Sequence, residues 1–303
     1  MGTLFKKFFL NLAQSTSQMH GFDTELFEEF VVDFIEEVHW NILTHYVTMP
    51  VTRPYRLTVR TDPFHGSNRG SIPRRVMKMK YKIIFIHGFG VKKDARGLFT
   101  EIASALQNDP EIRGVECVLT DLNIVSQENN NIILNPLSKQ AQIVREVFGK
   151  NSGEGAVVDL VCHSQGCVVG ALADLPGLRK VVLMTPPVNN DFTKILEFFK
   201  SRPDTVINLE GESYLARADG SRTIAPKEYW QDGQDINYLE EYKKLAEHNN
   251  LTTIIANQDE VVSNESVSEL SEIGEVIKLD SDHNFTGETR QKLIGVLRTV
   301  LTI

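Results

Sequence analysis

The sequence contains little cysteine, no long apolar run and no surplus of positive charge. Three of its 303 residues are cysteines, too few for a disulfide-stapled scaffold and consistent with free thiols in a reducing compartment. No segment approaches the roughly 18 apolar residues that a membrane-spanning helix needs. The formal net charge is −8, which provides no general attraction to nucleic acid. We therefore expect a cytoplasmic globular protein without a nucleic-acid partner.

Residues 1–80 differ from the rest of the chain and are assigned to an N-terminal extension of helix and loop. In "DTELFEEFVVDFIEEVHWNIL", apolar residues recur at helical spacing, with acidic residues between them. The opening stretch "MGTLFKKFFLNL" is interpreted as a helix docked on its own domain; contact with a membrane surface is the alternative. Six basic residues and no acidic one lie between Arg69 and Lys82. Such a run is more often a solvated loop than a patch for an acidic partner.

From residue 81 onward, predicted strands alternate with predicted helices. The strands are short apolar runs, and in the helices apolar residues recur three and four positions apart. This alternation predicts an α/β fold: a mostly parallel sheet with helices on both faces, in one domain spanning 81–303. Strands are predicted at 82–90, 115–123, 156–162, 178–184, 251–257 and 274–280. Helices are predicted at 95–107, 138–150 and 165–174, from near Ser263 and from about Thr286.

Residues 186–250 interrupt this alternation and are predicted to form a lid insertion. Helical patterns at 191–202 and 236–248 flank "SYLARADGSRTIAP". An Asp-Gly pair between two short runs is a strong hairpin signal. An insertion of this length between core strands is well placed to cover the carboxyl ends of the sheet. We interpret its aromatic residues as the core of the lid in preference to substrate contacts.

Three residue types used together in nucleophilic catalysis follow three different predicted strands. Ser164 follows the strand at 156–162, Asp259 the strand at 251–257 and His283 the strand at 274–280. Ligand sites of parallel sheets lie at the carboxyl ends of the strands. A serine hydroxyl needs a base to accept its proton, and the base needs a carboxylate to orient it. The order serine, acid, histidine therefore predicts a catalytic triad at this end of the sheet.

Other residues compete for two of these roles. His248 also follows the serine, but it ends a polar helix ahead of a strand, on the wrong side of the sheet. Glu260 is the fallback for the acid. Asp280 and Asp282 are too near His283 in the sequence to be preferred, and Asp191, after the fourth strand, is a rarer placement.

The chain from about Tyr81 onward resembles the α/β-hydrolase superfamily. The matching segments are "HGFG" at 87–90, "CHSQG" at 162–166, "NQDEVV" at 257–262 and "DHNF" at 282–285. The resemblance implies an oxyanion hole in which the backbone N–H of Phe89 joins that of Gln165, the amide at the predicted helix start. His87 is then a structural hydrogen-bonding residue.

The sequence departs from the usual pattern at Cys162, which stands where a glycine is expected two residues before the serine. We expect cysteine to be tolerated because the residues two before and two after the serine approach each other and need only be small. Cys162, His163 and Cys167 could also be soft metal ligands. Their spacing matches no common zinc motif, and no fourth ligand is near in the sequence. We therefore predict neither a metal nor another cofactor.

These residues lead us to expect a serine hydrolase acting on a small-molecule carboxylic ester through an acyl-enzyme on Ser164. An acyl thioesterase or an amidase with the same triad is the nearest alternative. A non-catalytic binding module, with the N-terminal helices as its interaction surface, is the alternative from another class. The oligomeric state is left open by the sequence.

Overall fold

The computed structural model describes residues 80–303 except 111, 113, 191–192, 263–266 and 302–303. The predicted helices of the N-terminal extension and most of the basic run therefore lie outside the described residues. So does Asp191, the rarer candidate for the triad acid.

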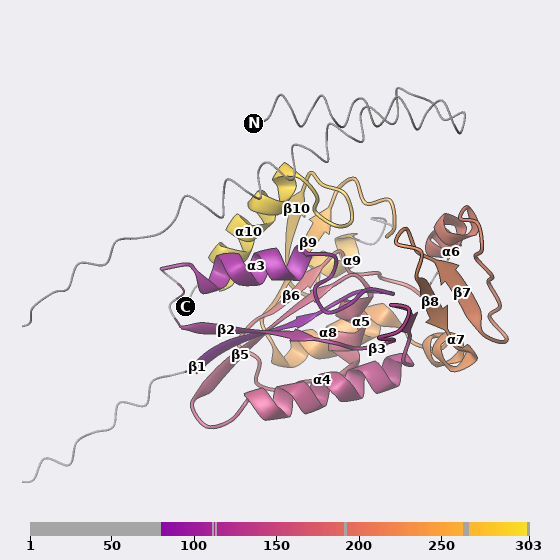
Figure 1. The fold of residues 1–303 in the computed structure, drawn as a ribbon. Coiled ribbons are helices and arrows are strands. Elements are labelled where there is room, and N and C mark those ends of the chain that lie inside the picture. Colours follow the sequence, from indigo (N-terminus) through magenta and orange to yellow (C-terminus); the bar gives the residue numbers. More distant parts are fainter. Residues whose placement is uncertain (1–79, 111, 113, 191–192, 263–266, 302–303) are drawn as a thin grey trace, which may run out of the picture. The chain divides into compact units, whose positions relative to one another are not determined.

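Six parallel strands form the central sheet, in the order β10-β9-β6-β5-β1-β2 (Figure 1). Each strand coincides with one of the six predicted apolar runs, because a strand covered on both faces is apolar along its length. The bounds are β1 Lys80–Ile86, β2 Val115–Thr120, β5 Ala156–His163, β6 Val181–Met184, β9 Leu251–Ala256 and β10 Glu275–Leu279.

Helices cover both faces of this sheet (Figure 1). Helices α4, α5 and α8 pack with one buried cluster, which includes Leu160 and Leu183 of the strands. Helices α3 and α10 pack with the other, which includes Phe85 and Val182. The predicted α/β fold is confirmed. The bounds are α3 Leu98–Gln107, α4 Leu137–Asn151, α5 Gln165–Leu172, α8 Tyr238–His248, α9 Val267–Ser271 and α10 Glu288–Leu301.

The segment between β6 and β9 folds beside one end of the sheet and forms the predicted hairpin. A second, four-stranded sheet has the order β3-β4-β8-β7. It joins the hairpin to the loop after β2, because β4 pairs with β8 in register Ile132↔Thr223. The bounds are β3 Ile124–Val125, β4 Ile132–Ile133, α6 Thr193–Lys200, β7 Ser213–Ala216, β8 Arg222–Ala225 and α7 Lys227–Gly233.

Two local expectations were incomplete. The helix predicted from residue 95 begins at Leu98, because Ala95 (φ 49°), Arg96 (φ 57°) and Gly97 (φ 88°) all adopt left-handed backbone conformations. The sequence pattern also gave no sign of β3, β4 and α7. The two strands are two residues long, too short to show a periodicity.

Strands β1 and β5 are neighbours whose following helices cover opposite faces of the sheet. The crevice outside the carboxyl ends of such a strand pair is the usual ligand site of open parallel sheets. Here the two loops that leave this crevice begin at His87 and Ser164. The topology therefore brings "HGFG" and "CHSQG" together.

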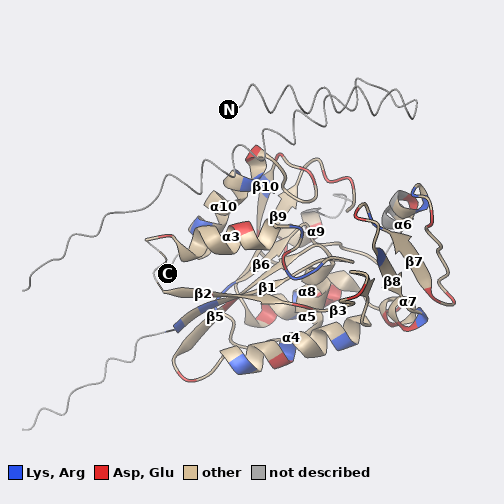
Figure 2. Cartoon of the chain, viewed as in Figure 1, with Lys and Arg blue, Asp and Glu red and all other residues tan. Residues whose placement is uncertain are grey.

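Charged residues lie mainly on the outer helices, whereas β6 carries none (Figure 2). Helix α4 shows both signs on its outer side, as a solvated helix does. Among residues 80–303, apart from the gaps given above, no helix is long and apolar enough to cross a bilayer.

Candidate active site

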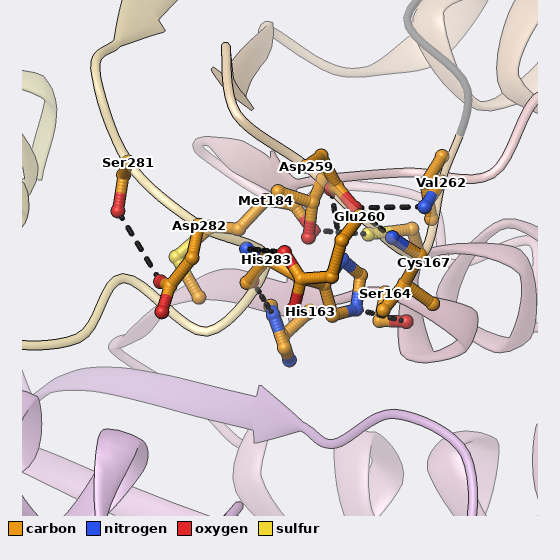
Figure 3. Close-up of polar contacts among 12 residues, drawn as sticks. His163, Ser164, Cys167, Met184, Asp259, Glu260, Val262, Ser281, Asp282 and His283 are labelled. Atoms are coloured by element: carbon orange, nitrogen blue, oxygen red, sulfur yellow. Dashed lines mark hydrogen bonds and ion pairs between the residues drawn. The ribbon is translucent and has the colours of Figure 1, made fainter. Parts of the chain in front are cut away.

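Ser164 occupies a strained turn between β5 and α5. Its backbone has φ 54° and ψ −130°, a conformation that residues other than glycine rarely adopt. Such strain costs about 1–3 kcal/mol and persists only where the surroundings enforce it. The Ser164 N–H donates to Met184 O at 2.9 Å, which ties the turn to the end of β6. The sharp turn leaves the hydroxyl at the sheet edge (Figure 3).

Two glycines let the end of β1 approach this turn. A Cβ on Gly166 would lie 2.3 Å from Ile86 O and 2.6 Å from His87 O. A Cβ on Gly88 would lie 2.9 Å from the Cβ of Ser164. Neither position accepts a side chain without a backbone shift, so both glycines are required by the close approach of β1 to β5.

The tolerance of Cys162 has a different cause from the one predicted. Gly166 faces the backbone of β1, not Cys162. The Cys162 thiol instead packs against Gly170, where a Cβ would lie only 2.7 Å from Sγ. A missing side chain one turn farther along α5 therefore makes room for the thiol. Gly166 must be small because of the backbone of β1, and Gly170 must be small because of the Cys162 thiol.

His283 joins Ser164 to Asp259 (Figure 3). Its Nε2 lies 3.0 Å from Ser164 Oγ, and its Nδ1 lies 2.8 Å from Asp259 Oδ2. The three predicted residues thus meet at hydrogen-bond distance, although 119 positions separate Ser164 from His283 in the chain. The Asp259 side chain is 1% exposed, so this contact is shielded from water.

Asp259 is held by both of its carboxylate oxygens. Oδ2 faces the histidine, while Oδ1 accepts the backbone N–H groups of Val261 at 2.8 Å and Val262 at 2.7 Å. Burial by itself would raise the pKa of Asp259. The hydrogen bond and charge of His283 and the two backbone donors outweigh burial, and the net pKa lies below the ordinary value. The carboxylate therefore stays ionised while it orients the imidazole.

The competing carboxylates bind elsewhere. Glu260 Oε2 accepts the backbone N–H of His283 at 3.2 Å, so it supports the histidine loop without touching the ring. Asp280 accepts the side-chain amide of Gln258, and Asp282 accepts the N–H of Thr286. Among the described candidates, Asp259 alone contacts the His283 ring.

Two buried side chains outside the predicted triad, His163 and Arg290, fix the loop carrying His283. His163 Nε2 lies 2.9 Å from His283 O, and the two rings have centroids 5.0 Å apart. Arg290 Nε donates to Phe285 O at 2.9 Å, and its Nη2 donates to Asn284 O at 3.1 Å. The sequence shows that His163 precedes Ser164. It does not show that the partner of His163 is the carbonyl of His283, 120 residues away.

Because it donates from Nε2 to a carbonyl, His163 must keep that proton without becoming an imidazolium. Burial and the neighbouring His283 lower the pKa of His163 to about 3. The unfolded chain binds a proton at this side chain near pH 6.5, whereas the folded protein does so only near pH 3. The free energy of unfolding therefore falls as the pH drops from about 6.5 toward 3, by up to ~1.4 kcal/mol per pH unit from this group.

Replacing His163 with Gln is expected to remove that part of the pH dependence. The amide can still donate to His283 O, but it does not titrate. Urea unfolding at a series of pH values between 4 and 7.5 measures the slope. His248→Gln, the same change at an exposed histidine, should leave the slope as in the wild type. An unchanged slope in His163→Gln would contradict the assignment.

His87 makes the structural hydrogen bonds expected of it. Its Nε2 accepts the backbone N–H of Leu122 at 3.1 Å, and its Nδ1 donates to Gly88 O at 2.9 Å. Burial lowers the pKa of His87, which keeps the ring neutral with its proton on Nδ1. The ring thereby shapes the loop that carries Phe89.

Phe89 and Gln165 are the two residues whose backbone N–H groups the resemblance assigns to an oxyanion hole. Gln165 is the first residue of α5, where backbone N–H groups have no intrahelical acceptor. Phe89 directly follows Gly88, where an added Cβ would lie 2.9 Å from the Cβ of Ser164. Within the described residues, neither backbone N–H donates a hydrogen bond. In this part of the chain, both backbone N–H groups are thus free to donate.

The insertion holds both of these residues. The Gln165 side-chain amide donates to Tyr229 Oη, and the Phe89 ring lies 5.8 Å, centroid to centroid, from the ring of Tyr229. Arg217 Nη1 and Thr223 Oγ1 both donate to Gly90 O, the latter at 3.4 Å. The insertion therefore supports the loop after β1 and the start of α5 through direct contacts.

A small cavity opens directly onto Ser164. Its volume is about 60 Å³, well below the roughly 300–1,000 Å³ of pockets that enclose drug-sized ligands. Tyr229 and Trp230 of the insertion are buried and do not line this space. The lining residues are Gly88, Phe89, Val91, Ala95, Arg96, His163, Ser164, Val261, His283 and Asn284.

The side chains once considered as metal ligands have other partners. His163 contacts His283 O, Cys162 packs on Gly170, and Cys167 Sγ donates to Met184 O at 3.5 Å. Burial raises the pKa of Cys162 and of Cys167 above the ordinary thiol value. Both thiols are therefore protonated, and a protonated thiol is a poor metal ligand.

Comparison with known proteins places the fold. No family model matches the sequence, and no curated protein matches it. Among solved structures, a peroxisomal alpha-beta-hydrolase from Saccharomyces cerevisiae has a TM-score of 0.51 at 12% identity, covering 73% of this chain and 74% of that one. A lipase-esterase related protein from Clostridium acetobutylicum has a TM-score of 0.50 at 16% identity, covering 73% and 94%.

A third structure, DcsB in complex with its substrate analogue, has a TM-score of 0.52 at 16% identity, covering 74% of this chain and 90% of that one. At such identities the likeness concerns the course of the backbone. It agrees with the parallel sheet covered by helices on both faces. The chain therefore has the fold of the α/β-hydrolase superfamily.

Proposed function

We propose that this protein is a serine hydrolase that cleaves carboxylic esters through an acyl-enzyme on Ser164. Ser164 Oγ attacks the carbonyl carbon while His283 Nε2 takes the hydroxyl proton. The C–O bond to the leaving group then breaks, and the leaving oxygen takes that proton from His283. Water, deprotonated by the same nitrogen, attacks the acyl-enzyme and releases the acid and free Ser164.

The chain of contacts from Ser164 Oγ through His283 to Asp259 is the observation that carries this proposal. Nε2 is close enough to receive the serine proton, and the ionised Asp259 stabilises the imidazolium that results. The N–H groups of Phe89 and Gln165 are the proposed donors to the oxyanion. Each such donor contributes about 3–4 kcal/mol to transition-state stabilisation.

The size of the cavity favours a short acyl group. A volume of about 60 Å³ matches a short acyl group, and the buried side chains of Tyr229 and Trp230 do not line it. Esters are the leading substrates because solved structures of this fold include proteins described as esterases and lipases. Acyl thioesters and amides use the same triad and are tested beside esters.

A non-catalytic binding module is the competing function. A module without chemistry has no need for a strained serine, a buried ionised carboxylate and two donors without partners at one edge. Their joint presence favours the enzyme.

A fluorophosphonate probe tests the proposal, because it reacts with an activated serine. We expect labelling of the wild type, and of Ser138→Ala at an exposed serine, but none of Ser164→Ala. Hydrolysis of matched acetyl, butyryl and octanoyl esters, thioesters and amides then ranks the leaving groups. Equal labelling of wild type and Ser164→Ala would overturn the proposal. No labelling of either, together with no turnover of any of these substrates, would favour the binding module.

A further inference from the structure

One charged side chain lines the cavity beside the proposed triad without an assigned task. Arg96 shares this space with Ser164 and His283, and no carboxylate is among the residues that line it. Within the described part of the chain, the Arg96 guanidinium makes no hydrogen bond or ion pair, and its side chain is exposed to solvent. Among the described residues, a cation without a hydrogen-bond or ion-pair partner therefore lines the reaction space.

The backbone that carries Arg96 is strained. Ala95 at φ 49°, Arg96 at φ 57° and Gly97 at φ 88° follow one another in left-handed conformations. Each left-handed residue other than glycine costs about 1–2 kcal/mol. The turn is held by Ala95 N–H donating to Lys92 O at 2.9 Å and Phe99 N–H donating to Asp94 O at 3.1 Å. Strain retained next to a reaction space is typical of residues placed for function.

The charges around Arg96 leave room for an anion. Arg217 and Arg202 are the nearby charges of the same sign as Arg96, and Asp219 is the nearby charge of opposite sign. Asp219 is already shared: its Oδ1 lies 3.6 Å from Arg217 Nε and 2.5 Å from Ser221 Oγ. Counting Arg96 itself, guanidinium groups outnumber carboxylates by three to one in this set, so the charges that act on Arg96 are mostly of its own sign.

We propose that Arg96 binds a carboxylate of the substrate, so that the enzyme acts on esters carrying a free carboxylate near the scissile bond. This inference rests on the proposed ester hydrolysis and names its substrate class. A guanidinium suits the task because its planar fork matches a carboxylate with two parallel hydrogen bonds. A carboxylate is also small enough for a cavity of about 60 Å³.

The carboxylate could belong to the acyl group or to the leaving group, and two pairs of substrates separate these cases. The leaving-group pair is 4-acetoxybenzoate and its neutral isostere 4-acetoxybenzamide. The acyl pair is monoethyl glutarate and the ethyl ester of glutaric acid monoamide. Within each pair the quantity measured is the ratio of kcat/KM for the anionic ester to kcat/KM for the neutral one.

Three variants isolate Arg96. Arg96→Asn removes the charge with a residue that tolerates left-handed backbone well, so its thermal unfolding should match the wild type. Arg96→Lys keeps a point charge but loses the fork. Lys93→Asn removes a charge from the same loop, at an exposed residue paired with Asp121 and outside the cavity.

We expect the wild type to prefer the anionic ester in one of the two pairs, and that pair identifies the side on which the carboxylate lies. Arg96→Asn should lower this ratio by about 10- to 100-fold, the range of a charge-assisted hydrogen bond. The ratio for Arg96→Lys should fall between those of the wild type and Arg96→Asn. The ratio for Lys93→Asn should match that of the wild type. Rising salt should reduce the wild-type ratio.

A ratio of one or less in both pairs, or a ratio that Arg96→Asn leaves unchanged, would overturn this inference alone, provided that the fluorophosphonate still labels Ser164. Loss of the ratio in Lys93→Asn to the same degree would overturn it as well, because the effect would then belong to the general charge of the loop. If Ser164 is not labelled, the proposed function fails and this inference fails with it.

Discussion

Asp259→Asn is expected to lower kcat about 10⁴-fold. The reason lies in the second oxygen of the carboxylate. Oδ1 accepts the N–H groups of Val261 and Val262, and in the variant this position requires the amide oxygen. The amide nitrogen then faces His283 Nδ1 and donates to it. The imidazole must carry its own proton on Nε2, which points at Ser164 and can no longer accept the hydroxyl proton.

Glu260→Gln is the matched control for this substitution. Its oxygen accepts the backbone N–H of His283, which an amide oxygen does equally well, so kcat should change little. Turnover of a short neutral ester by both variants, with far-UV circular dichroism to confirm folding, decides the matter. An active Asp259→Asn enzyme beside an inactive Glu260→Gln enzyme would assign the acid of the triad to Glu260 instead.

Gly166→Ala is expected to destabilise the protein by about 1–3 kcal/mol and to remove most of its activity. The added methyl would lie 2.3 Å from Ile86 O and 2.6 Å from His87 O. These are backbone atoms of a central strand and the loop after it, so α5 must move away from β1. That movement changes the distance between the two proposed oxyanion donors, the backbone N–H groups of Gln165 and Phe89.

Gly295→Ala is the control, because it makes the same change inside helix α10 where no atom lies within 4 Å of the new methyl. It should stabilise the protein by about 0.5–1 kcal/mol, as alanine does relative to glycine within a helix. Chemical unfolding and ester turnover of both variants give the comparison. A stabilising effect at Gly166 would show that the turn does not need the close approach of β1.

Much of the architecture was predictable because the central strands are buried on both faces. Their apolar runs stand out from the sequence, and all six are found in the sheet. The elements that escaped prediction are those whose stability comes from distant partners. β4 exists because β8 lies beside it, and the left-handed turn at Ala95 and Arg96 interrupts what reads as a continuous helical pattern.

The candidate site divides in the same way. Ser164, Asp259 and His283 could be chosen from the order of residue types after strands, because parallel strands bring their carboxyl ends to one edge. The residues that hold the triad in place could not be predicted from the order of residue types. His163 acts on a carbonyl 120 residues away, and Arg290 contacts the loop at Asn284 and Phe285 only after α10 has packed.

The stretch "VCHSQGC" shows how the two sources of information differ. Its residue types by themselves determined that a small-residue turn presents a serine at the end of a buried strand. Only the tertiary structure decided that Gly166 must be small because of the backbone at the end of β1, and that the Cys162 thiol packs against Gly170. It also decided that Arg96 lines the same cavity as Ser164. Periodicity reports which side of an element is buried, whereas contacts between elements depend on how the whole chain packs.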